Sequence, residues 1–504
     1  MNQNPGKKLW PWWKTWKTFP KTSPPSVLHL VSRCLRKWTN RMFCWRAKGI
    51  VTLVLLALVG ERLDGDHGIS DFQSGGATTV FEKGPNAFGM PLANVTRVNR
   101  RAHIVGNSFF NKNWVMAPSS TTARDGLGPL FNARSCSSCH VRDGRGSPPL
   151  EGQLPTSLLF RLSIPGQDAV GRNRPDPVFG KQLAVRAIPG VEPEGNVSIT
   201  YESVERRFAD GTVYELLKPS YKLRTSSKYG HPHPDLMISP RIASPVMGLG
   251  LLEAVPEEEV VKNSDPDDRD GDDISGKPNY VWNPESKKKE LGRFGWKANQ
   301  PNLRQQTATA FREDIGITSS IRPLESYTKA QADLLKGKPN GGHPEIDELT
   351  LGRVVTYLQT LAPPAQRTPR DPKVIRGKEL FREIGCSLCH LTTMKTGPQG
   401  AIAELRRQTI HPYTDLLLHD MGEELADHRA DGEASGSEWR TPPLWGIGLT
   451  KIVNGHTRFL HDGRARNLEE AILWHGGEAL VSRKAYTSLT KEQRSSMLAF
   501  LESL

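Results

Sequence analysis

The chain is poor in cysteine. Six of its 504 residues are cysteine, and two of these, Cys34 and Cys44, lie within the first 48 residues. The other four occur in two pentapeptides, CSSCH at residues 136–140 and CSLCH at residues 386–390. Cysteine chemistry in the main part of the chain is therefore confined to these two places.

Acidic residues are absent from residues 1–48, which hold eleven Lys or Arg. This segment accounts for most of the formal net charge of +13, and the rest of the chain carries only about +2 (13 minus 11). Binding of nucleic acid through a global basic field needs a larger excess of positive charge. The charge pattern therefore excludes nucleic acid as an expected partner.

The N-terminal region lacks an apolar run of the roughly twenty residues that a transmembrane helix needs. Its apolar run, residues 49–60, has twelve residues and follows Arg46 and Lys48. That length is typical of the h-region of a signal peptide. We expect residues 1–60 to be a basic extension with a signal peptide, and the protein to be exported to the periplasm. The cleavage site fits a small-x-small pattern poorly, so an uncleaved N-terminal membrane anchor is the alternative.

Cys-x-x-Cys-His is the attachment signature of c-type haem, in which both thiols bind the haem and the histidine becomes an axial iron ligand. The sequence therefore predicts two covalently bound haems. The alternatives are a structural zinc site in which the two pairs meet, and a thioredoxin-like redox pair. Zinc ribbons join their pairs by a short loop, whereas about 250 residues separate these. The residues expected to bind haem are Cys136, Cys139, His140, Cys386, Cys389 and His390.

The two pentapeptides lie in a repeat, LFNARSCSSCH and then LFREIGCSLCH. Downstream of each copy the sequence predicts a helix: residues 351–361 have one apolar face, and the last helix opens with a capping box at Thr490 and Gln493. This arrangement is similar to the cytochrome c fold. We expect a mainly α protein with two cytochrome c-like domains, residues 61–365 and residues 366–504.

Residues 150–290 read as a large insertion in the first domain. Val197–Tyr201 and Val213–Leu217 are β-like runs around a turn at Asp210-Gly211, which predicts a small β-hairpin. The acidic stretch that follows gathers hard oxygen ligands on a turn-prone loop, which suits calcium. A solvated acidic loop is the alternative. The expected calcium ligands are Asp267, Asp268, Asp270 and Asp272.

Most of residues 100–504 resembles the di-haem cytochrome c peroxidase and MauG-like superfamily, most of all the di-haem oxidoreductases described as thiol oxidoreductases. The stretches that carry the resemblance are GLGPLFNARSCSSCH, GLGLLEAVPE, DPDDRDGDDISG, LGRFGWKANQPNLRQQTATAFREDIGITS, YTDLLLHDMGEELADH, WRTPPLWGIGL and FLHDGRARNLEEAILWHGG. The thiols in that label would be those consumed by haem.

The resemblance implies four catalytic residues near the first haem. In the peroxidases a tryptophan lies between the haems and a glutamine follows ten residues later, a spacing that Trp296 and Gln306 keep. A distal acid follows, for which Asp314 is the first choice and Glu313 the alternative. A peroxide-reducing iron needs such a group to move a proton between the two oxygens.

The two irons are expected to differ in their sixth ligand. No His or Met lies between His140 and His231, so the first iron is expected to be five-coordinate or water-ligated and reactive. More distant candidates for that position are His231, His233 and Met247.

The second iron has more candidates. The family's methionine falls just after the LEEAI helix, where this chain has His475. The resemblance therefore implies His475 as the second axial ligand, and interaction with its helix C-terminus is the alternative reading. The other candidates are Met421, His411, His419, His428, His456 and His461.

The sequence thus predicts an exported di-haem oxidoreductase that reduces hydrogen peroxide at the first haem with electrons passed through the second. Peroxide or dioxygen and a small redox protein, a cytochrome or a cupredoxin, are the expected partners. One alternative is MauG-like or oxygenase-like oxidation of an organic or protein substrate. The other is a non-catalytic di-haem electron-transfer protein.

Overall fold

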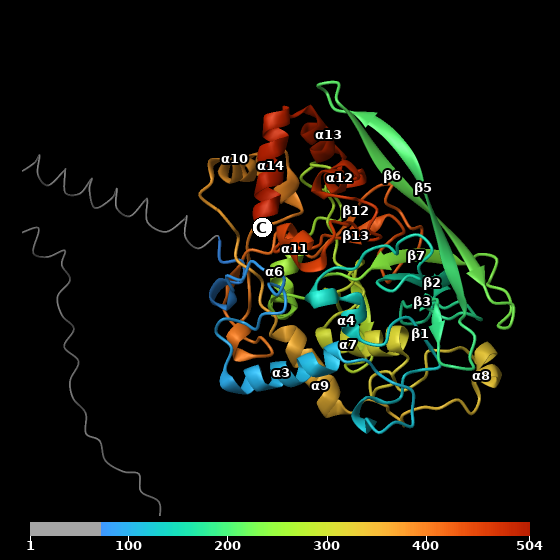
Figure 1. Ribbon diagram of the computed structural model, residues 1–504. Coiled ribbons are helices and arrows are strands. Elements are labelled where there is room, and N and C mark those ends of the chain that lie inside the picture. The colour runs from blue at the N-terminus through green and yellow to red at the C-terminus, as the bar shows by residue number, and fades with distance from the viewer. Residues whose placement is uncertain (1–71) are drawn as a thin grey trace, which may run out of the picture. The chain divides into compact units, whose positions relative to one another are not determined.

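Both helices and strands contribute to residues 72–504, the part of the chain that the computed structural model describes (Figure 1). Helices make up 29% and strands 19% of the structure, so the prediction of a mainly α protein is wrong. The main cause is the insertion, whose strands are longer and more numerous than the sequence indicated. The predicted extension and signal peptide of residues 1–60 lie outside the described residues.

Two pairs of packed helices form the frame of the molecule. Helix α3 (Arg97–Asn111) packs against α9 (Glu348–Gln359), and α10 (Pro372–Glu383) packs against α14 (Lys491–Ser503) (Figure 1). The predicted capping box of α14 is present. The pairs have the same construction, one helix before a pentapeptide and one that closes over it. The division into two cytochrome c-like domains stays a prediction.

A glycine lets the helices of each pair approach closely. A Cβ atom on Gly106 of α3 would lie 2.1 Å from the carbonyl oxygen of Arg353 in α9. A Cβ atom on Gly377 of α10 would lie 2.0 Å from the carbonyl oxygen of Ser496 in α14. No side chain fits at either position, since both distances are far below van der Waals contact. These equivalent crossings support the internal repeat seen in the sequence.

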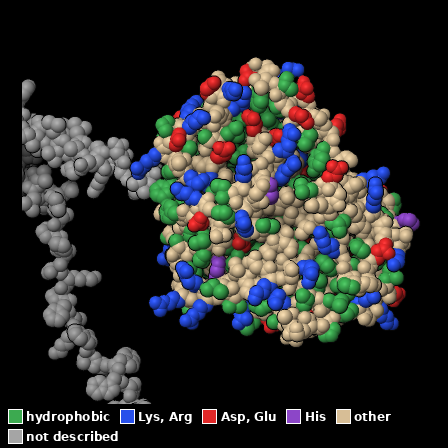
Figure 2. All heavy atoms as spheres, viewed as in Figure 1, with side chains coloured by type: hydrophobic (Ala, Val, Ile, Leu, Met, Phe, Trp, Pro, Cys, Tyr) green, Lys and Arg blue, Asp and Glu red, His purple; other side chains and the backbone are tan. Residues whose placement is uncertain are grey.

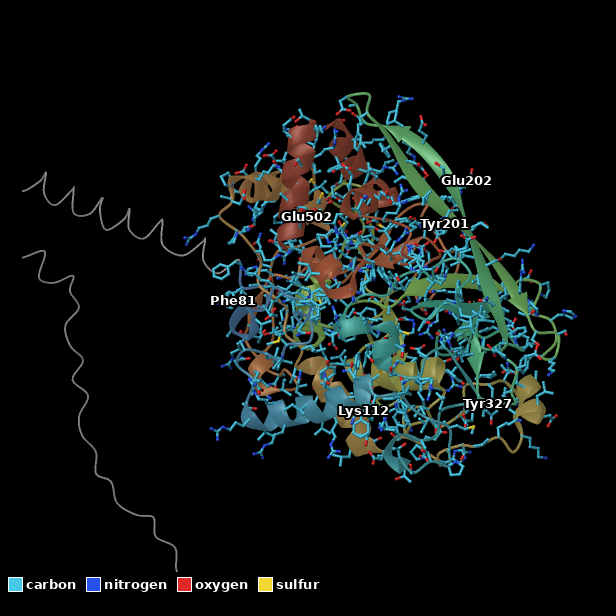
Figure 3. All side chains as sticks on the ribbon, in the orientation of Figure 1. Phe81, Lys112, Tyr201, Glu202, Tyr327 and Glu502 are labelled. Atoms are coloured by element: carbon cyan, nitrogen blue, oxygen red, sulfur yellow. The ribbon has the colours of Figure 1, made fainter. Side chains whose placement is uncertain are left out.

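The insertion contains a sheet of three antiparallel strands and a long hairpin. The sheet has the order β3-β2-β7, with β2 (Leu158–Gln167) between β3 (Asn173–Arg174) and β7 (Met237–Ile242). The hairpin pairs β5 (Gly195–Arg207) with β6 (Val213–Thr225). Figure 3 marks β5 by the labels on its exposed Tyr201 and Glu202. The predicted hairpin is therefore confirmed, but its strands are more than twice as long as the predicted runs.

The tip of the hairpin is fixed to the C-terminal helices. The amide of Ala209 donates to the carbonyl of Thr487 (3.0 Å), at the end of α13 (Leu480–Ser488). Arg494 of α14 pairs with Asp210 (2.9 Å) and lies over the ring of Phe208 (3.9 Å). The hairpin thus ties the insertion to the part of the chain that carries the second pentapeptide.

The remaining strands and helices are short. Figure 2 shows Lys and Arg interspersed with Asp and Glu on the viewed face. Among residues 72–504, no helix combines the length and apolar character that a membrane span requires. The short elements are α4 (Cys136–Cys139), α5 (Leu249–Glu253), α6 (Glu257–Val261), α7 (Leu303–Ala310), η4 (Phe311–Ile315), α8 (Lys329–Leu335), α11 (Thr450–Asn454), α12 (Leu468–Leu473), β1 (Leu130–Phe131), β4 (Arg186–Ala187), β8 (Tyr280–Asn283), β9 (Lys288–Leu291), β10 (Met394–Lys395), β11 (Thr409–Ile410), β12 (Leu418–Asp420) and β13 (Glu438–Arg440).

Candidate active site

The first four residues of the first pentapeptide form the short helix α4, and its two cysteines line a cavity together with its last residue, His140. The Nδ1 atom of His140 lies 2.7 Å from the carbonyl oxygen of Ser244. A carbonyl can only accept, so Nδ1 carries the proton and Nε2 keeps its lone pair for a metal. Burial lowers the pKa of His140, which favours the neutral, ligating imidazole.

One face of α7 and of the π-helical turn η4 that continues it borders this first cavity. Leu303, Gln306, Thr307, Ala310 and Asp314 all line it. Their spacing of three or four residues places them on one side of the helix. π-Helical turns occur frequently at functional sites. The structure therefore places the predicted Gln306 and Asp314 at the same cavity as the first pentapeptide.

The neighbouring carboxylate Glu313 points elsewhere. Its side chain is 6% exposed, pairs with Arg312 and does not line the first cavity. The sequence did not decide between Asp314 and Glu313 as the distal acid. Of these two, only Asp314 lines the first cavity. Gln182 donates to its Oδ1 (2.8 Å). Burial raises the pKa of Asp314 above its ordinary value, although the charge of Arg161 and the Gln182 hydrogen bond oppose the shift.

The second pentapeptide lines a separate cavity. The Nδ1 atom of His390 lies 2.9 Å from the carbonyl oxygen of Tyr413, so its Nε2 is also free to bind a metal. Burial lowers the pKa of His390 to about 4. His475 lines the same cavity, and its Nδ1 donates to the carbonyl of Ala471 (2.7 Å). His475 therefore makes the contact with its own helix and still presents Nε2 to the cavity.

The other candidate ligands divide into two groups. Met421, His419 and His461 line the second cavity, whereas His411, His428 and His456 do not. Met247 lines the first cavity, and neither His231 nor His233 does. The structure thus leaves fewer candidates for each iron than the sequence did.

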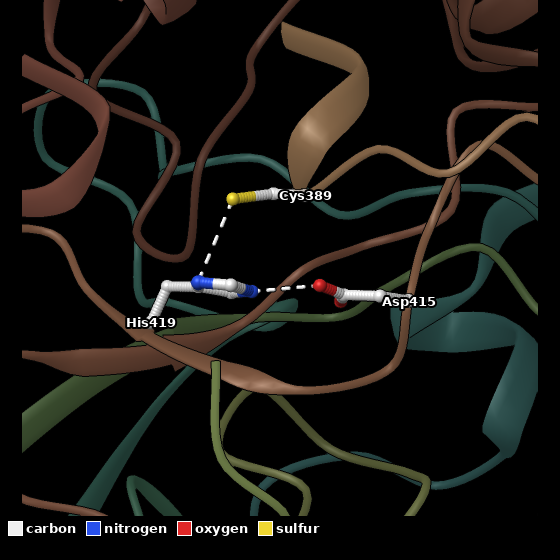
Figure 4. A group of neighbouring side chains, drawn as sticks. All are labelled: Cys389, Asp415 and His419. Atoms are coloured by element: carbon white, nitrogen blue, oxygen red, sulfur yellow. Dashed lines mark hydrogen bonds and ion pairs between the residues drawn. The ribbon is translucent and has the colours of Figure 1, made fainter. Parts of the chain in front are cut away.

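His419 is held between two carboxylates beside Cys389. Its Nε2 lies 2.7 Å from Oδ2 of Asp415 and its Nδ1 lies 2.6 Å from Oε2 of Glu478. The Sγ atom of Cys389 is 3.5 Å from Nδ1 (Figure 4). Burial alone would lower the pKa of His419, but its hydrogen bonds with Asp415, Cys389 and Glu478 together raise it well above its ordinary value. With both ring nitrogens engaged, His419 is placed to support the pentapeptide rather than to bind iron.

Trp296 separates the two cavities and lines both of them. It is 7% exposed, and its Nε1 donates to the carbonyl of Ile242 (2.8 Å). The ring of His461 lies 6.5 Å from it and stacks on Trp439 at 3.9 Å. Trp296 thus lies at the border of the two cavities, and its role between two haems stays a prediction.

Arg145 and Arg440 also line both cavities. Neither forms an ion pair with any residue in the described part of the chain, and Nε and Nη1 of Arg145 are buried without a hydrogen-bond partner. A buried guanidinium without a partner lowers the stability of the fold, so we expect an anion to bind at this place. Haem propionates are such anions, and the residues present fit haem. Sequence reasoning missed both arginines, since neither belongs to the pentapeptides.

The placement and the pKa of the thiols argue against a zinc site and against a thioredoxin-like redox pair. The two Cys-x-x-Cys pairs line different cavities, so they do not meet in one zinc site. Burial raises the pKa of Cys136 and of Cys386 to about 12. A reactive redox thiol needs a lowered pKa. Both observations favour haem attachment.

The acidic loop brings three of the four predicted calcium ligands together. Carboxylate oxygens of Asp268, Asp270 and Asp272 lie within 4.8 Å of one another, whereas Asp267 pairs with Arg269 (3.8 Å). Burial, followed by the charges of Asp270 and Asp268, raises the pKa of Asp272. Calcium binding at this loop stays a prediction.

Comparisons with known proteins identify one family. A family model described as "Di-haem oxidoreductase, putative peroxidase" matches residues 69–161 and 175–504. No curated protein matches the chain. Among solved structures, hydrazine synthase from Kuenenia stuttgartiensis, determined under xenon pressure, is 12% identical and has a TM-score of 0.28, with 84% of this chain and 96% of that chain covered.

Proposed function

The chain belongs to the di-haem oxidoreductase family, and on that premise we propose that it reduces hydrogen peroxide at the first haem with electrons passed through the second. Two electrons and two protons convert one peroxide molecule into two molecules of water. Cys136, Cys139 and His140 would hold a haem in the first cavity, and its iron would supply the redox chemistry. The described residues supply proton transfer, positioning and the connection between the sites.

The observation that carries the proposal is the placement of Asp314. Its carboxyl group faces the cavity of the first pentapeptide, and Gln182 fixes its orientation. Cleavage of peroxide needs a group that takes a proton from one oxygen and returns it to the other. Burial, which raises the pKa of Asp314, makes the carboxylate a better proton acceptor. Gln306, about two helical turns away on the same face, is placed to orient the peroxide.

The ligand environments favour unequal roles for the two sites. The residues lining the first cavity include one histidine, His140. Those lining the second include four: His390, His419, His461 and His475. His390 and His475 would both hold the second haem, and a haem with two protein ligands would suit electron transfer. Trp296, which borders both cavities, supplies an aromatic connection between them.

We also propose covalent attachment of both haems and a periplasmic location. The support for attachment is that both thiols of each pair line the same cavity as the histidine that follows them. Haem of the c type is attached outside the cytoplasm in bacteria, and a small cytochrome or cupredoxin is then the natural electron donor.

Replacement of Asp314 tests the proposed function. Asp314→Asn should lower the rate of peroxide turnover by about 10²- to 10⁴-fold, since this is the range that general acid–base groups contribute. Both haems should remain bound, as read from the pyridine haemochrome spectrum. Glu313→Gln changes the adjacent carboxylate, which faces away from the cavity, and should keep most of the activity. Full turnover in Asp314→Asn would exclude Asp314 as the proton-transfer group.

A further inference from the structure

A third pocket adjoins the cavity of the first haem. It provides about 370 Å³ for the centres of water-sized molecules, and it lies among β2, α7, η4 and the loops at residues 321–324 and 429–432. Arg161, Asn299 and Gln300 line both this pocket and the first cavity. These three residues therefore border both spaces.

Helix α7 and the turn η4 present different faces to the two spaces. Gln305, Thr309, Arg312 and Glu313 line the third pocket, whereas Gln306 and Asp314 line the first cavity. The same helix thus carries the proposed proton-transfer group on one side and a second set of polar side chains on the other. A ligand in the pocket would lie on the other side of this helix from Gln306 and Asp314.

The lining of the pocket is strongly basic. It includes six cationic side chains and two carboxylates, Glu313 and Asp431. The cations are Arg161, Arg172, Lys181, Arg312, Arg322 and Arg429. Six positive against two negative charges leave an excess of four on a concave surface, where the field is concentrated.

Three of the cations are already paired. Arg312 pairs with Glu313, Arg429 with Asp431 (3.2 Å), and Arg172 with Asp168 (2.8 Å). Within residues 72–504, the other three cations, Arg161, Lys181 and Arg322, form no ion pair. Burial lowers the pKa of Arg322, although the charge of Glu313 opposes the shift.

A buried donor in the pocket also lacks a partner. Arg429 is 5% exposed, and its Nε atom makes no hydrogen bond. The pocket therefore combines unpaired positive charge with an unused N–H group. Both features are met by a ligand that carries several anionic oxygens, since guanidinium groups bind carboxylate and phosphate with paired hydrogen bonds.

We propose that this pocket binds a small organic anion that carries carboxylate or phosphate groups. The positive lining concentrates such compounds next to the first cavity. Arg161 contacts the bound anion and also lines the first cavity. If the anion is presented to the first haem, that role rests on the proposed function. Binding of the anion to the pocket does not depend on the proposed function.

Calorimetric titration of the purified holoprotein with citrate, used as a probe tricarboxylate, tests the proposal. The double variant Lys181→Gln/Arg322→Gln removes two unpaired charges and should bind citrate about 10²-fold more weakly, since each lost charged hydrogen bond is worth about tenfold. The control Lys395→Gln/Lys484→Gln removes the same charge at two exposed positions outside the pocket and should change the affinity by less than about twofold.

Lys181 is exposed at the rim, so Lys181→Gln alone should fold normally and show a smaller loss of affinity in the same direction. Absence of citrate binding to the unchanged protein, or equal weakening in the control, would overturn the proposal. Calorimetry reads binding without turnover. A protein that binds citrate in the pocket and fails to reduce peroxide would therefore refute the proposed function alone, and the reverse result would refute this inference alone.

Discussion

Arg145 is the residue whose charge is least compensated near the two cavities. It is 6% exposed, lies over the rings of Trp296 (5.8 Å) and Phe459 (5.3 Å), and has no ion-pair partner among the described residues. Burial lowers its pKa to about 10. An uncompensated buried cation is strongly destabilising, so we expect haem propionates from both sites to supply the missing negative charge.

Replacement of Arg145 should therefore change the reduction potentials of both haems. In Arg145→Gln a positive charge is removed, which stabilises ferric iron and shifts both potentials to lower values. Spectroelectrochemical titration measures this without turnover. Arg241→Gln is a matched control, because Arg241 lines only the first cavity and pairs with Asp431 (2.9 Å). It should leave the second haem unchanged. Unshifted potentials in Arg145→Gln would contradict the assignment.

Sequence patterns predicted residues for haem chemistry but not the side chains that surround them in the fold. The two pentapeptides mark their six residues by spacing alone, and the resemblance added Trp296, Gln306 and Asp314. The choice between Asp314 and Glu313 needed the structure, because a one-residue step on a helix turns a side chain by about 100°. Arg145 carries no local signal, since its importance comes from burial without a counter-charge.

At the scale of elements, the hairpin β5–β6 explains why the strand content was underestimated. The sequence predicted only Val197–Tyr201 and Val213–Leu217, because the rest of each strand is rich in charged residues and gives no regular alternation. The strands extend further because a few side chains anchor them. Tyr221, which lies beyond the predicted run, donates to Asp462 (2.9 Å). Long-range contacts of this kind override local preference.

The start of the hairpin holds a buried carboxyl group, Glu194, that should make stability depend on pH. Its oxygens accept from the amide of Ala184 and from Gln331 of α8. Burial raises the pKa of Glu194 from 4.5 to about 8. The folded protein therefore keeps this proton at pH values where the unfolded chain releases it. The contribution to stability is complete below about pH 4.5 and is lost as the pH rises to about 8, at about 1.4 kcal/mol per pKa unit of difference.

Glu194→Gln carries a neutral side chain at every pH. The apparent melting temperature of this variant should fall less between pH 5 and pH 8 than that of the unchanged protein, as differential scanning calorimetry would show. Parallel pH profiles for the two proteins would mean that Glu194 is ionised in the folded state.

At the scale of the whole molecule, two similar pairs of helices surround two different candidate sites. The equivalent glycine crossings at Gly106 and Gly377 show that the frames are alike. The difference arises from what surrounds each pentapeptide: the first cavity is bordered by Asp314 and the basic pocket, the second by several histidines. The sequence indicated this inequality, but the position of Trp296 and of the two arginines between the cavities required the folded chain.

The central claim is that one haem reacts and the other transfers electrons. The most direct test is the electron paramagnetic resonance spectrum of the ferric holoprotein before and after addition of hydrogen peroxide. We predict a high-spin signal from one haem that peroxide changes, together with a low-spin signal from a six-coordinate haem. Two low-spin signals that peroxide leaves unchanged would contradict the claim and identify the protein as an electron carrier.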